Sequence, residues 1–240
     1  MRQISLIVLS FFDYFHKKKI INFIKKKIDK IDTVIDVGAH HGESVKLFVK
    51  NFKTKNIFSF EPSLENFQRL SDNVRFLIKK NKINFYVYNL GLGKKEETSY
   101  LNMPLETSSS TINSINKESD YYKKKNKFLG EGNKDFFNKK EIVKIVTLDS
   151  VMKKNVLELV DLIKIDTEGF EYEVLQGSEE VLKKTRILLF EHHYDSMLLK
   201  NYTFRQVHDF LILNNFKKVF KAKMPFRKTF DYIYENTKEL

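Results

Sequence analysis

Residues 34–44 carry the pattern from which the architecture can be worked out, and they read Val34-Ile35-Asp36-Val37-Gly38-Ala39-His40-His41-Gly42-Glu43-Ser44. The pattern is a short apolar strand, a turn with two glycines and the start of a helix. Glycine has no Cβ and permits a tight turn, and the first residues of a helix offer free N–H groups. Sheets of α/β proteins bind nucleotide-like ligands at such turns. The dinucleotide motif G-x-G-x-x-G is not met, because Gly38 and Gly42 stand four positions apart, so the spacing favours a smaller ligand.

Beyond this segment, short apolar strands alternate with amphipathic helices, which is typical of a mostly parallel sheet covered by helices on both faces. Ser63 is placed to N-cap one such helix, whose apolar residues recur every three or four positions. The last two strands are expected to pair as a terminal hairpin. This layout resembles the α/β, Rossmann-like class I methyltransferase fold, with a seven-stranded sheet and a C-terminal antiparallel strand. The strands are expected at residues 34–37, 57–60, 85–88, 162–165, 187–190, 216–220 and 230–234.

The length and composition fit one globular domain. A chain of 240 residues is within the size that α/β folds build around one core, and a hydrophobic fraction of 42% is too high for a disordered chain. There is no cysteine, which excludes disulfides, thiolate metal sites and a cysteine nucleophile. We expect the Rossmann-like domain over residues 32–240 and a helical cap over residues 1–31.

The expected cap begins with an apolar stretch, residues 4–15, which is too short to span a bilayer, contains Asp13 and lacks the small-residue cleavage site of a signal peptide. Residues 17–30 then predict an amphipathic helix with isoleucines on one side and lysines elsewhere. Packing on the domain is the favoured interpretation, and contact with a membrane surface is the alternative. The expected location is the cytoplasm, with peripheral membrane contact as the second option.

The formal net charge is +12, a value that usually suggests nucleic acid or an anionic membrane as a partner. However, only six of the 43 basic residues are arginine, and recognition of bases and phosphates favours the planar arginine fork. The lysines gather at residues 17–30, 79–82, 123–127 and 217–223, away from the acidic strand ends. We expect a solvated basic surface that attracts an anionic acceptor or membrane, and no nucleic-acid partner.

Acidic residues mark the ends of three predicted strands. Glu61 ends the second strand about twenty residues after the glycine turn, where a carboxylate accepts the hydroxyl hydrogens of a ribose in dinucleotide-binding folds. Asp166 and Glu168 follow the fourth strand, and Asp36 lies in the first. Since ligands bind outside the carboxyl ends of parallel strands, we expect these acids to line one crevice. Capping of the next helix is an alternative for Asp166 and Glu168, and Glu171 is assigned to the dipole of that helix.

One histidine after the fifth strand, His192, is a candidate general base, because the pKa of histidine lies near neutral pH. Alternatively, Asp166, Glu168, Glu191 and His192 could hold a hard cation through oxygen and imidazole ligands. Their spacing follows strand ends rather than a dedicated ligand motif, so the sequence predicts no metal site.

Residues 102–140 show no sustained hydrophobic period and are rich in serine, asparagine and lysine. Such a long irregular stretch in a compact domain is usually a functional lid or a disordered segment. We expect an insertion here that covers the acceptor and whose hydroxyls and lysines suit a polar or anionic substrate.

Taken in order, these motifs resemble the FkbM family of S-adenosylmethionine-dependent methyltransferases over about residues 32–195. The resemblance implies O-methylation of a hydroxyl-bearing acceptor, such as a sugar or glycan. His40 and Gly91 stand where the family usually has Asn and Ala. The segments that carry the resemblance are Val34–Ala39, Phe60-Glu61-Pro62-Ser63, Val146-Thr147-Leu148-Asp149, Lys164-Ile165-Asp166-Thr167-Glu168-Gly169 and Glu173-Val174-Leu175 with Gly177.

The resemblance also implies positions for the cofactor. The methyl group would lie near Asp166 and Glu168, and the ribose near Glu61. The methionine part of S-adenosylmethionine would contact Asp36, Gly38, Ala39 and Gly42, and the adenine side Pro62, Ser63, Asn89 and Leu90.

Methyl transfer to a hydroxyl needs a base, for which Asp166, Glu168 and His192 are the candidates. Three other functions stay open. The first is RNA methylation, but the sequence has no Asn-Pro-Pro-Tyr or Asp-Pro-Pro-Tyr run for amino-group methylation and no cysteine for C5 methylation. A nicotinamide enzyme would need the missing third glycine, and the strand-end acids speak against a binding protein without catalysis.

Overall fold

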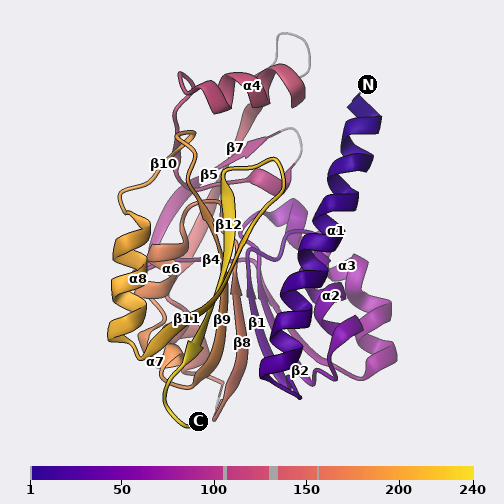
Figure 1. Cartoon of the computed structure of the whole chain (residues 1–240), viewed down its shortest axis with the longest axis vertical. Helices are drawn as coiled ribbons and strands as arrows, with labels where there is room; N and C mark the ends of the chain where they lie inside the picture. The colour runs from indigo at the N-terminus through magenta and orange to yellow at the C-terminus, as the bar shows by residue number, and fades with distance from the viewer. Residues whose placement is uncertain (1, 105–106, 130–134, 156) are drawn as a thin grey trace.

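A computed structural model describes residues 2–104, 107–129, 135–155 and 157–240 of the chain. Its central sheet contains β1 (Thr33–Val37), β2 (Asn56–Phe60), β3 (Asn84–Tyr88), β8 (Val160–Ile165), β9 (Thr185–His193), β11 (Phe216–Lys223) and β12 (Thr229–Asn236). The strand order is β11-β12-β9-β8-β1-β2-β3 (Figure 1). The first five strands along the chain are parallel, and β12 runs antiparallel between β9 and β11. All the strands predicted for this sheet are present, and the predicted α/β class is confirmed.

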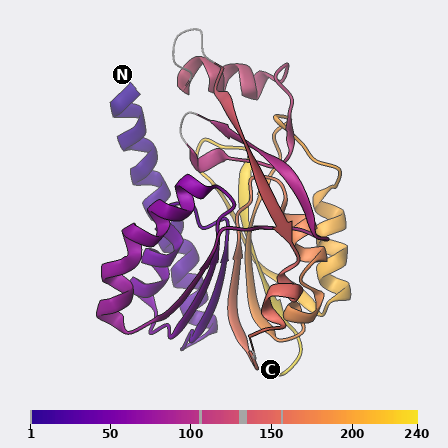
Figure 2. The same cartoon turned by 180° about the vertical axis from the view of Figure 1, so that it is seen from behind.

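Helices cover both faces of the central sheet (Figures 1 and 2). Successive strand residues alternate between the faces, so that Val34 packs in one core and Ile35 in the other. Both side chains are fully buried, which explains why the strands read as continuous apolar runs. The Val34 side is covered by α1 (Arg2–Lys27), α2 (Glu43–Asn51) and α3 (Leu64–Asn81), and the Ile35 side by α5 (Leu148–Met152), α6 (Glu171–Gln176), α7 (Glu179–Leu182) and α8 (Phe204–Leu213).

The N-terminal segment is one continuous helix, α1, rather than an apolar stretch followed by a separate basic helix. Ile20, Ile21 and Ile24 are buried in the same core as Val34, as the amphipathic pattern requires. The N-terminal half of α1 extends past the carboxyl ends of the strands (Figure 1). The side chains of residues 4–10 lie outside the described part of the structure. Among the described helices, none combines the length and apolarity needed to cross a membrane.

A smaller sheet lies over the carboxyl edge of the central one (Figure 1). It contains β4 (Gly91–Leu92), β7 (Phe137–Val146) and β5 (Glu97–Pro104), in the order β4-β7-β5. The antiparallel pair β5–β7 buries Leu101, Met103 and Val143 in a small core of its own. Because these strands bury only a few apolar side chains, their period is weak in the sequence.

The stretch 102–140, predicted to be irregular, is therefore partly regular structure. It holds the end of β5, the start of β7, η1 (Thr107–Ser109), β6 (Ser114–Ile115) and α4 (Asp120–Leu129). β6 pairs with β10 (Leu198–Leu199), which ties this layer to the chain after β9. Residues 105–106 and 130–134 of the stretch lie outside the described residues.

Candidate active site

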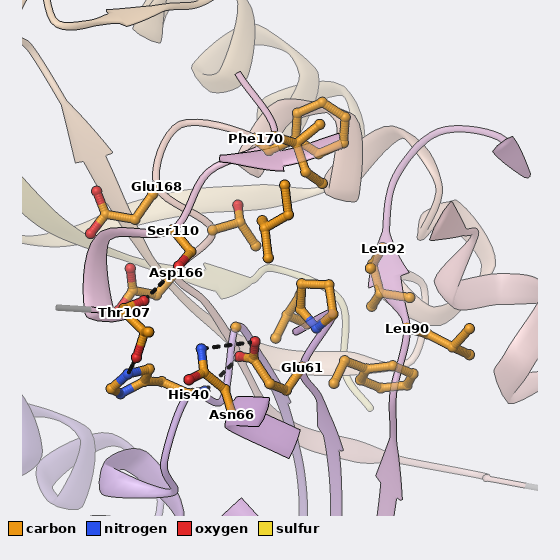
Figure 3. A pocket seen from close by; sticks show the side chains of 18 of the residues that line it. His40, Glu61, Asn66, Leu90, Leu92, Thr107, Ser110, Asp166, Glu168 and Phe170 are labelled. Carbon is orange, nitrogen blue, oxygen red and sulfur yellow. Dashed lines mark hydrogen bonds between the residues drawn. The ribbon is translucent and has the colours of Figure 1, made fainter. Parts of the chain in front are cut away.

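A pocket lies where β1, β2 and β8 end, and β4 and β5 of the smaller sheet also line it. Figure 3 shows the side chains around it. The stretch 102–140 forms part of its wall through η1 and the residues that follow. The crevice expected at the strand ends is thus a pocket whose walls come from two layers, the central sheet and the stretch above it. Of the residues singled out from the sequence, Gly38, Glu61, Pro62, Leu90, Asp166 and Glu168 line it.

The glycine turn works mainly through packing. Gly38 has φ 75, and a Cβ there would overlap the backbone carbonyl of Asp166. Gly42 has φ 88, and a Cβ there would lie 2.6 Å from the side chain of Val74 in α3. Ala39 is buried, and neither Ala39 nor Gly42 lines the pocket. Of the turn residues predicted to contact a cofactor, Gly38 alone is therefore on the pocket wall, and the others support the turn.

Asp36 also lies behind the pocket rather than on its wall. Its carboxylate is fully buried, and neither oxygen has a hydrogen bond within the described residues. Nζ of Lys164 lies 3.5 Å from Oδ1 of Asp36 and 3.3 Å from Oδ2 of Asp166. Burial raises the pKa of Asp36 to about 6 against the opposing charge of Lys164. For Asp166, burial also raises the pKa, but Lys164 and His193 outweigh it and leave the pKa below its usual value.

Glu61 is fixed by backbone donors on both sides. Its Oε2 accepts from the N–H of His40 at 2.8 Å, and its Oε1 accepts from the N–H of Ser63 at 3.0 Å. Burial raises the pKa of Glu61 although these N–H groups oppose the change. Asn89 donates to the carbonyls of Glu61 and Pro62. Ser63 and Asn89 do not line the pocket, so they hold the Glu61 loop instead of forming the wall.

The pocket has an apolar end and a polar end, with Glu61 between them (Figure 3). A carboxylate offers about four acceptor sites, and three donors, the N–H groups of His40 and Ser63 and the amide of Asn66, already use some of them, so Glu61 retains about one site for a hydroxyl of a ligand. A flat apolar group, hydroxyls and a positive charge would each find matching surroundings here. Leu90, Leu92 and Phe170 lie at the apolar end, and His40, Thr107, Ser110, Asp166 and Glu168 at the polar end.

Thr107 and Ser110 are pocket residues that the sequence did not single out. Nε2 of His40 lies 2.9 Å from Oγ1 of Thr107, so the glycine turn touches the layer above it. His40 has φ 46, the left-handed backbone that Asn also tolerates well. Thr111 donates from its hydroxyl to the carbonyl of Glu168 at 2.7 Å. No local signal marks these residues, because the pairing that brings them over the pocket links distant parts of the chain.

His192 lies on the opposite side of β9 from the acids. It is buried among the rings of Tyr194, Tyr202 and Phe204, and burial lowers its pKa to about 3. It does not line the pocket. Because side chains alternate along a strand, the histidine that faces the acids is the next one, His193. His192, the candidate base from the sequence, therefore points away from the pocket, and its neighbour His193 lies beside the acids.

His193 lies among three carboxylates. Its Nε2 is 3.3 Å from Oε2 of Glu168 and 3.0 Å from Oε1 of Glu191, and its Nδ1 is 3.4 Å from Oδ2 of Asp195. Burial lowers the pKa of His193, but these carboxylates outweigh burial and raise the pKa well above its usual value. In α4, burial and then the Asp195 carboxylate raise the pKa of Tyr121. The acids of the strand ends thus extend from the pocket toward α4.

Comparison with known proteins identifies the fold. Residues 36–220 match the family model described as the methyltransferase FkbM domain, and no curated protein sequence matches the chain. A magnesium protoporphyrin IX methyltransferase from Synechocystis, solved with bound SAM, has a TM-score of 0.52 at 6% identity, covering 92% of this chain and 78% of that one. A putative rRNA methylase from Clostridium thermocellum has a TM-score of 0.52 at 10% identity, covering 93% and 96%. An rRNA methylase from Streptococcus thermophilus has a TM-score of 0.50 at 12% identity, covering 91% and 94%. These identities show the fold alone, and the predicted class I methyltransferase fold is confirmed.

Proposed function

The chain belongs to the FkbM methyltransferase family, and on that premise we propose that it transfers a methyl group from S-adenosylmethionine to a hydroxyl oxygen of a sugar or glycan. One observation carries the proposal, which is that Asp166 and Glu168 stand on the wall of the same pocket as Glu61. This reaction requires that the methyl donor, the hydroxyl group that receives the methyl and a base that takes up the hydroxyl proton lie close together. The pocket has carboxylates both for the ribose of the donor and for the proton of the acceptor.

The acceptor, apolar and charged groups that line the pocket fit S-adenosylmethionine. Glu61 would accept the ribose hydroxyls, as acids at this strand end do in related sheets. Pro62 and Leu90 would contact the adenine, and the backbone of Gly38 would lie beside the methionine part. The negative charge of Asp166 suits a sulfonium. When bound, S-adenosylmethionine supplies an electrophilic methyl group.

The residues of the chain have two tasks in this reaction. Asp166 and Glu168 accept the proton of the acceptor hydroxyl, and Lys164 fixes Asp166 from behind. The wall formed by Thr107 and Ser110 holds the acceptor in place. Positioning of the oxygen at about 3 Å from the reacting carbon supplies much of the rate in such displacements.

Substitution of the two acids tests this assignment. We expect Asp166→Asn and Glu168→Gln each to lower kcat at least about 100-fold, the usual contribution of a proton acceptor. Asp72→Asn is the matched control, because the side chain of Asp72 is 71% exposed on α3, and it should keep wild-type turnover. Binding of S-adenosylhomocysteine, followed by thermal shift, checks that each variant is folded. Near-normal turnover in Asp166→Asn would remove Asp166 from the mechanism.

The acceptor class needs a separate experiment. Isotope-labelled S-adenosylmethionine is offered together with a glycan and lipid-linked sugar extract, and in parallel with total RNA. Label in the sugar fraction supports the proposal, and label in RNA contradicts it. Thermal shifts with S-adenosylhomocysteine and with NAD distinguish a methyltransferase from a nicotinamide enzyme, because only a bound ligand stabilises the fold.

We further propose that α1 holds the protein on an anionic membrane through an aromatic patch. The patch consists of Phe11, Phe12, Tyr14, Phe15 and Phe226, whose side chains are all exposed. The rings of Phe12 and Phe226 lie 5.2 Å apart, which joins α1 to the turn between β11 and β12. Exposed lysines follow directly at positions 17–19. Aromatic rings flanked by lysines suit the headgroup region of an anionic bilayer.

Co-sedimentation with vesicles tests the membrane contact. The protein should sediment with vesicles of equal parts phosphatidylcholine and phosphatidylglycerol, and much less with phosphatidylcholine alone. Phe11→Ser combined with Phe15→Ser should abolish sedimentation, whereas Phe76→Ser, at an aromatic residue 77% exposed on α3, should not. Equal sedimentation of both variants refutes the contact. A dimer that these two substitutions dissociate would assign the patch to a second copy of the chain instead.

A further inference from the structure

We propose that Glu168, Glu191 and His193 form a binding site for one divalent cation of the Mn²⁺ kind beside the methyltransferase pocket. One ligand atom from each of these side chains lies within 4.8 Å of the other two. Metal–ligand distances of about 2.0 to 2.4 Å allow three such atoms to share one ion. The site therefore needs little movement of the side chains to be filled.

The two strand ends position these ligands. Glu191 and His193 are two residues apart on β9, so they project from the same face. Glu168 comes from the turn after β8, where it has φ 51 and is followed by Gly169 with φ 95. This left-handed turn directs its carboxylate away from Phe170 and the apolar end of the pocket (Figure 3).

His193 supplies an observation that is independent of the acids. Only 7% of the residue is exposed, and its Nε2 has no hydrogen bond within the described residues, although two carboxylate oxygens lie beside it. The other ring nitrogen, Nδ1, lies 3.4 Å from Asp195 and 3.3 Å from Oγ1 of Thr229. A histidine that binds a metal commonly has its second nitrogen held by a carboxylate in this way. His193 is thus held as a metal ligand would be, and its Nε2 lies among carboxylate oxygens without a hydrogen bond in the described residues.

In direct ion pairs, the cluster has more carboxylates than cationic groups, and a bound cation would reduce this imbalance. Two other acids nearby have partners: the half-buried Asp13 pairs with Arg227, and the buried Asp231 pairs with His16. In the part of the chain that the structure describes, the ion pairs of Glu168, Glu191 and Asp195 all run to His193. Three carboxylates thus share one imidazole. Carboxylates suit Mn²⁺ and Mg²⁺, and imidazole favours first-row transition metals, so Mn²⁺ is the probe that matches both donors.

A second trio, His40, His41 and Glu43, also places three ligand atoms close together. Its groups already have partners: Nε2 of His40 contacts Thr107, and Nε2 of His41 lies 3.1 Å from Oδ1 of Asn66. The Glu43 side chain is 51% exposed. We therefore do not expect this trio to bind the cation, and a substitution in it serves as the matched control.

The ion would extend the chemistry of the pocket, and this role rests on the proposed function. A divalent cation at Glu168 would bind a hydroxyl oxygen of the acceptor and lower the pKa of that hydroxyl, which would leave Asp166 as the proton acceptor. The same ion would fix the oxygen in front of the methyl donor. Cation binding itself does not depend on the reaction, so the two proposals can fail separately.

Binding of Mn²⁺ tests the site without any measurement of activity. The purified full-length protein is dialysed against Mn²⁺, and the bound ion is counted by electron paramagnetic resonance. We expect one bound Mn²⁺ per chain, with nitrogen modulation in the spin-echo signal from the ligating imidazole. His193→Gln should remove the nitrogen modulation, and Glu191→Gln should weaken binding at least about tenfold, as loss of metal-site groups usually does. Glu43→Gln should bind Mn²⁺ as the wild type does.

Three outcomes would overturn the proposal. The first is a wild-type protein that retains neither Mn²⁺ nor Zn²⁺ after dialysis. The second is a bound ion without nitrogen modulation, which needs no variant to detect. The third is loss of the ion in Glu43→Gln with retention in Glu191→Gln. Unchanged affinity of the variants for S-adenosylhomocysteine verifies that they are folded, and loss of that affinity in the wild type would instead count against the proposed function.

Discussion

Gly38 shows how a single residue couples two parts of the site. Its φ of 75 and its close approach to the carbonyl of Asp166 leave no room for a side chain. The N–H groups of Gly38 and Ala39 both donate to the carbonyl of Phe60 at the end of β2. The turn after β1 is therefore in contact with the ends of β2 and β8, which carry Glu61 and Asp166. Movement at one of these strand ends would be felt at the other two.

This coupling predicts different results for two glycines. Gly38→Ala should destabilise the protein by at least about 3 kcal/mol, because it combines a left-handed backbone with a backbone overlap. Gly91→Ala should be tolerated within about 1 kcal/mol, since a Cβ there lies 3.3 Å from the Ile145 side chain, which can shift slightly. Urea unfolding of both variants measures the difference. Equal stability of the two variants would contradict the role given to Gly38.

Asp36 predicts a pH dependence of stability. Its pKa is about 6 in the folded protein and 3.8 in a model peptide, so the folded state holds the proton longer than the unfolded state does. Between pH 4 and 6 the unfolded state releases this proton first, and the free energy of unfolding therefore falls as the pH rises, by up to about 3 kcal/mol. Asp36→Asn has no proton to release. Its stability relative to the wild type should therefore increase from pH 4 to 6 in chemical unfolding, and a pH-independent difference would refute the argument.

At the scale of elements, two features limit what the sequence can predict: which face of the sheet each side chain of β9 projects from, and which distant strands pair. The seven strands, Glu61, Asp166 and Glu168 follow from local signals, which are an apolar run, a turn and an acid at the end. Whether His192 or His193 faces the acids depends on the register of the whole sheet, which no local pattern contains. Thr107 and Ser110 reach the pocket only because β5 pairs with β7 about forty residues away. Lys164 opens the Lys164–Gly169 segment that resembles the family, but the sequence does not show its role. That role is clear only in the structure, where its Nζ lies between the carboxylates of Asp36 and Asp166.

The position of α1 rests on a polar contact as well as on its isoleucines. Nε2 of His16 lies 2.5 Å from Oδ2 of Asp231 in β12, and both residues are buried. Asp13, one turn earlier, pairs with Arg227 at 3.0 Å. The helix that the sequence predicts as a cap therefore also supplies side-chain partners to Asp231 and Arg227 at the carboxyl edge of the sheet, next to the candidate active site.

Removal of His16 should loosen this helix. His16→Ala leaves the buried carboxylate of Asp231 without its partner, and the expected loss of stability is about 1 to 3 kcal/mol. Hydrogen exchange of the α1 amides should accelerate more than that of the β8 amides. Asn22→Ala, at an exposed position of the same helix, serves as the control and should leave both measurements unchanged. Uniform acceleration across the chain would mean that α1 does not open separately.

At the scale of the whole molecule, the charge of +12 is separated from the chemistry. The lysines at positions 17–19 and 25–27 are exposed on α1, whereas Asp36, Glu61 and Glu191 are enclosed at the strand ends. An anionic molecule is therefore attracted to the exposed lysines of α1 and not to the acidic strand ends. This arrangement suits a neutral hydroxyl-bearing acceptor group held on an anionic carrier or surface better than a phosphate-rich chain that must enter the pocket.

The separation makes a prediction about RNA. Adsorption of RNA to exposed lysines releases counterions, so its affinity should fall at least about 100-fold between 50 and 200 mM salt. Because the pocket is not part of that contact, saturating RNA should leave the affinity for S-adenosylhomocysteine unchanged. Fluorescence anisotropy of a labelled RNA duplex and calorimetry of S-adenosylhomocysteine binding measure the two quantities. RNA binding that persists at 200 mM salt and strengthens with S-adenosylhomocysteine would place RNA at the pocket and overturn the assignment of a sugar acceptor.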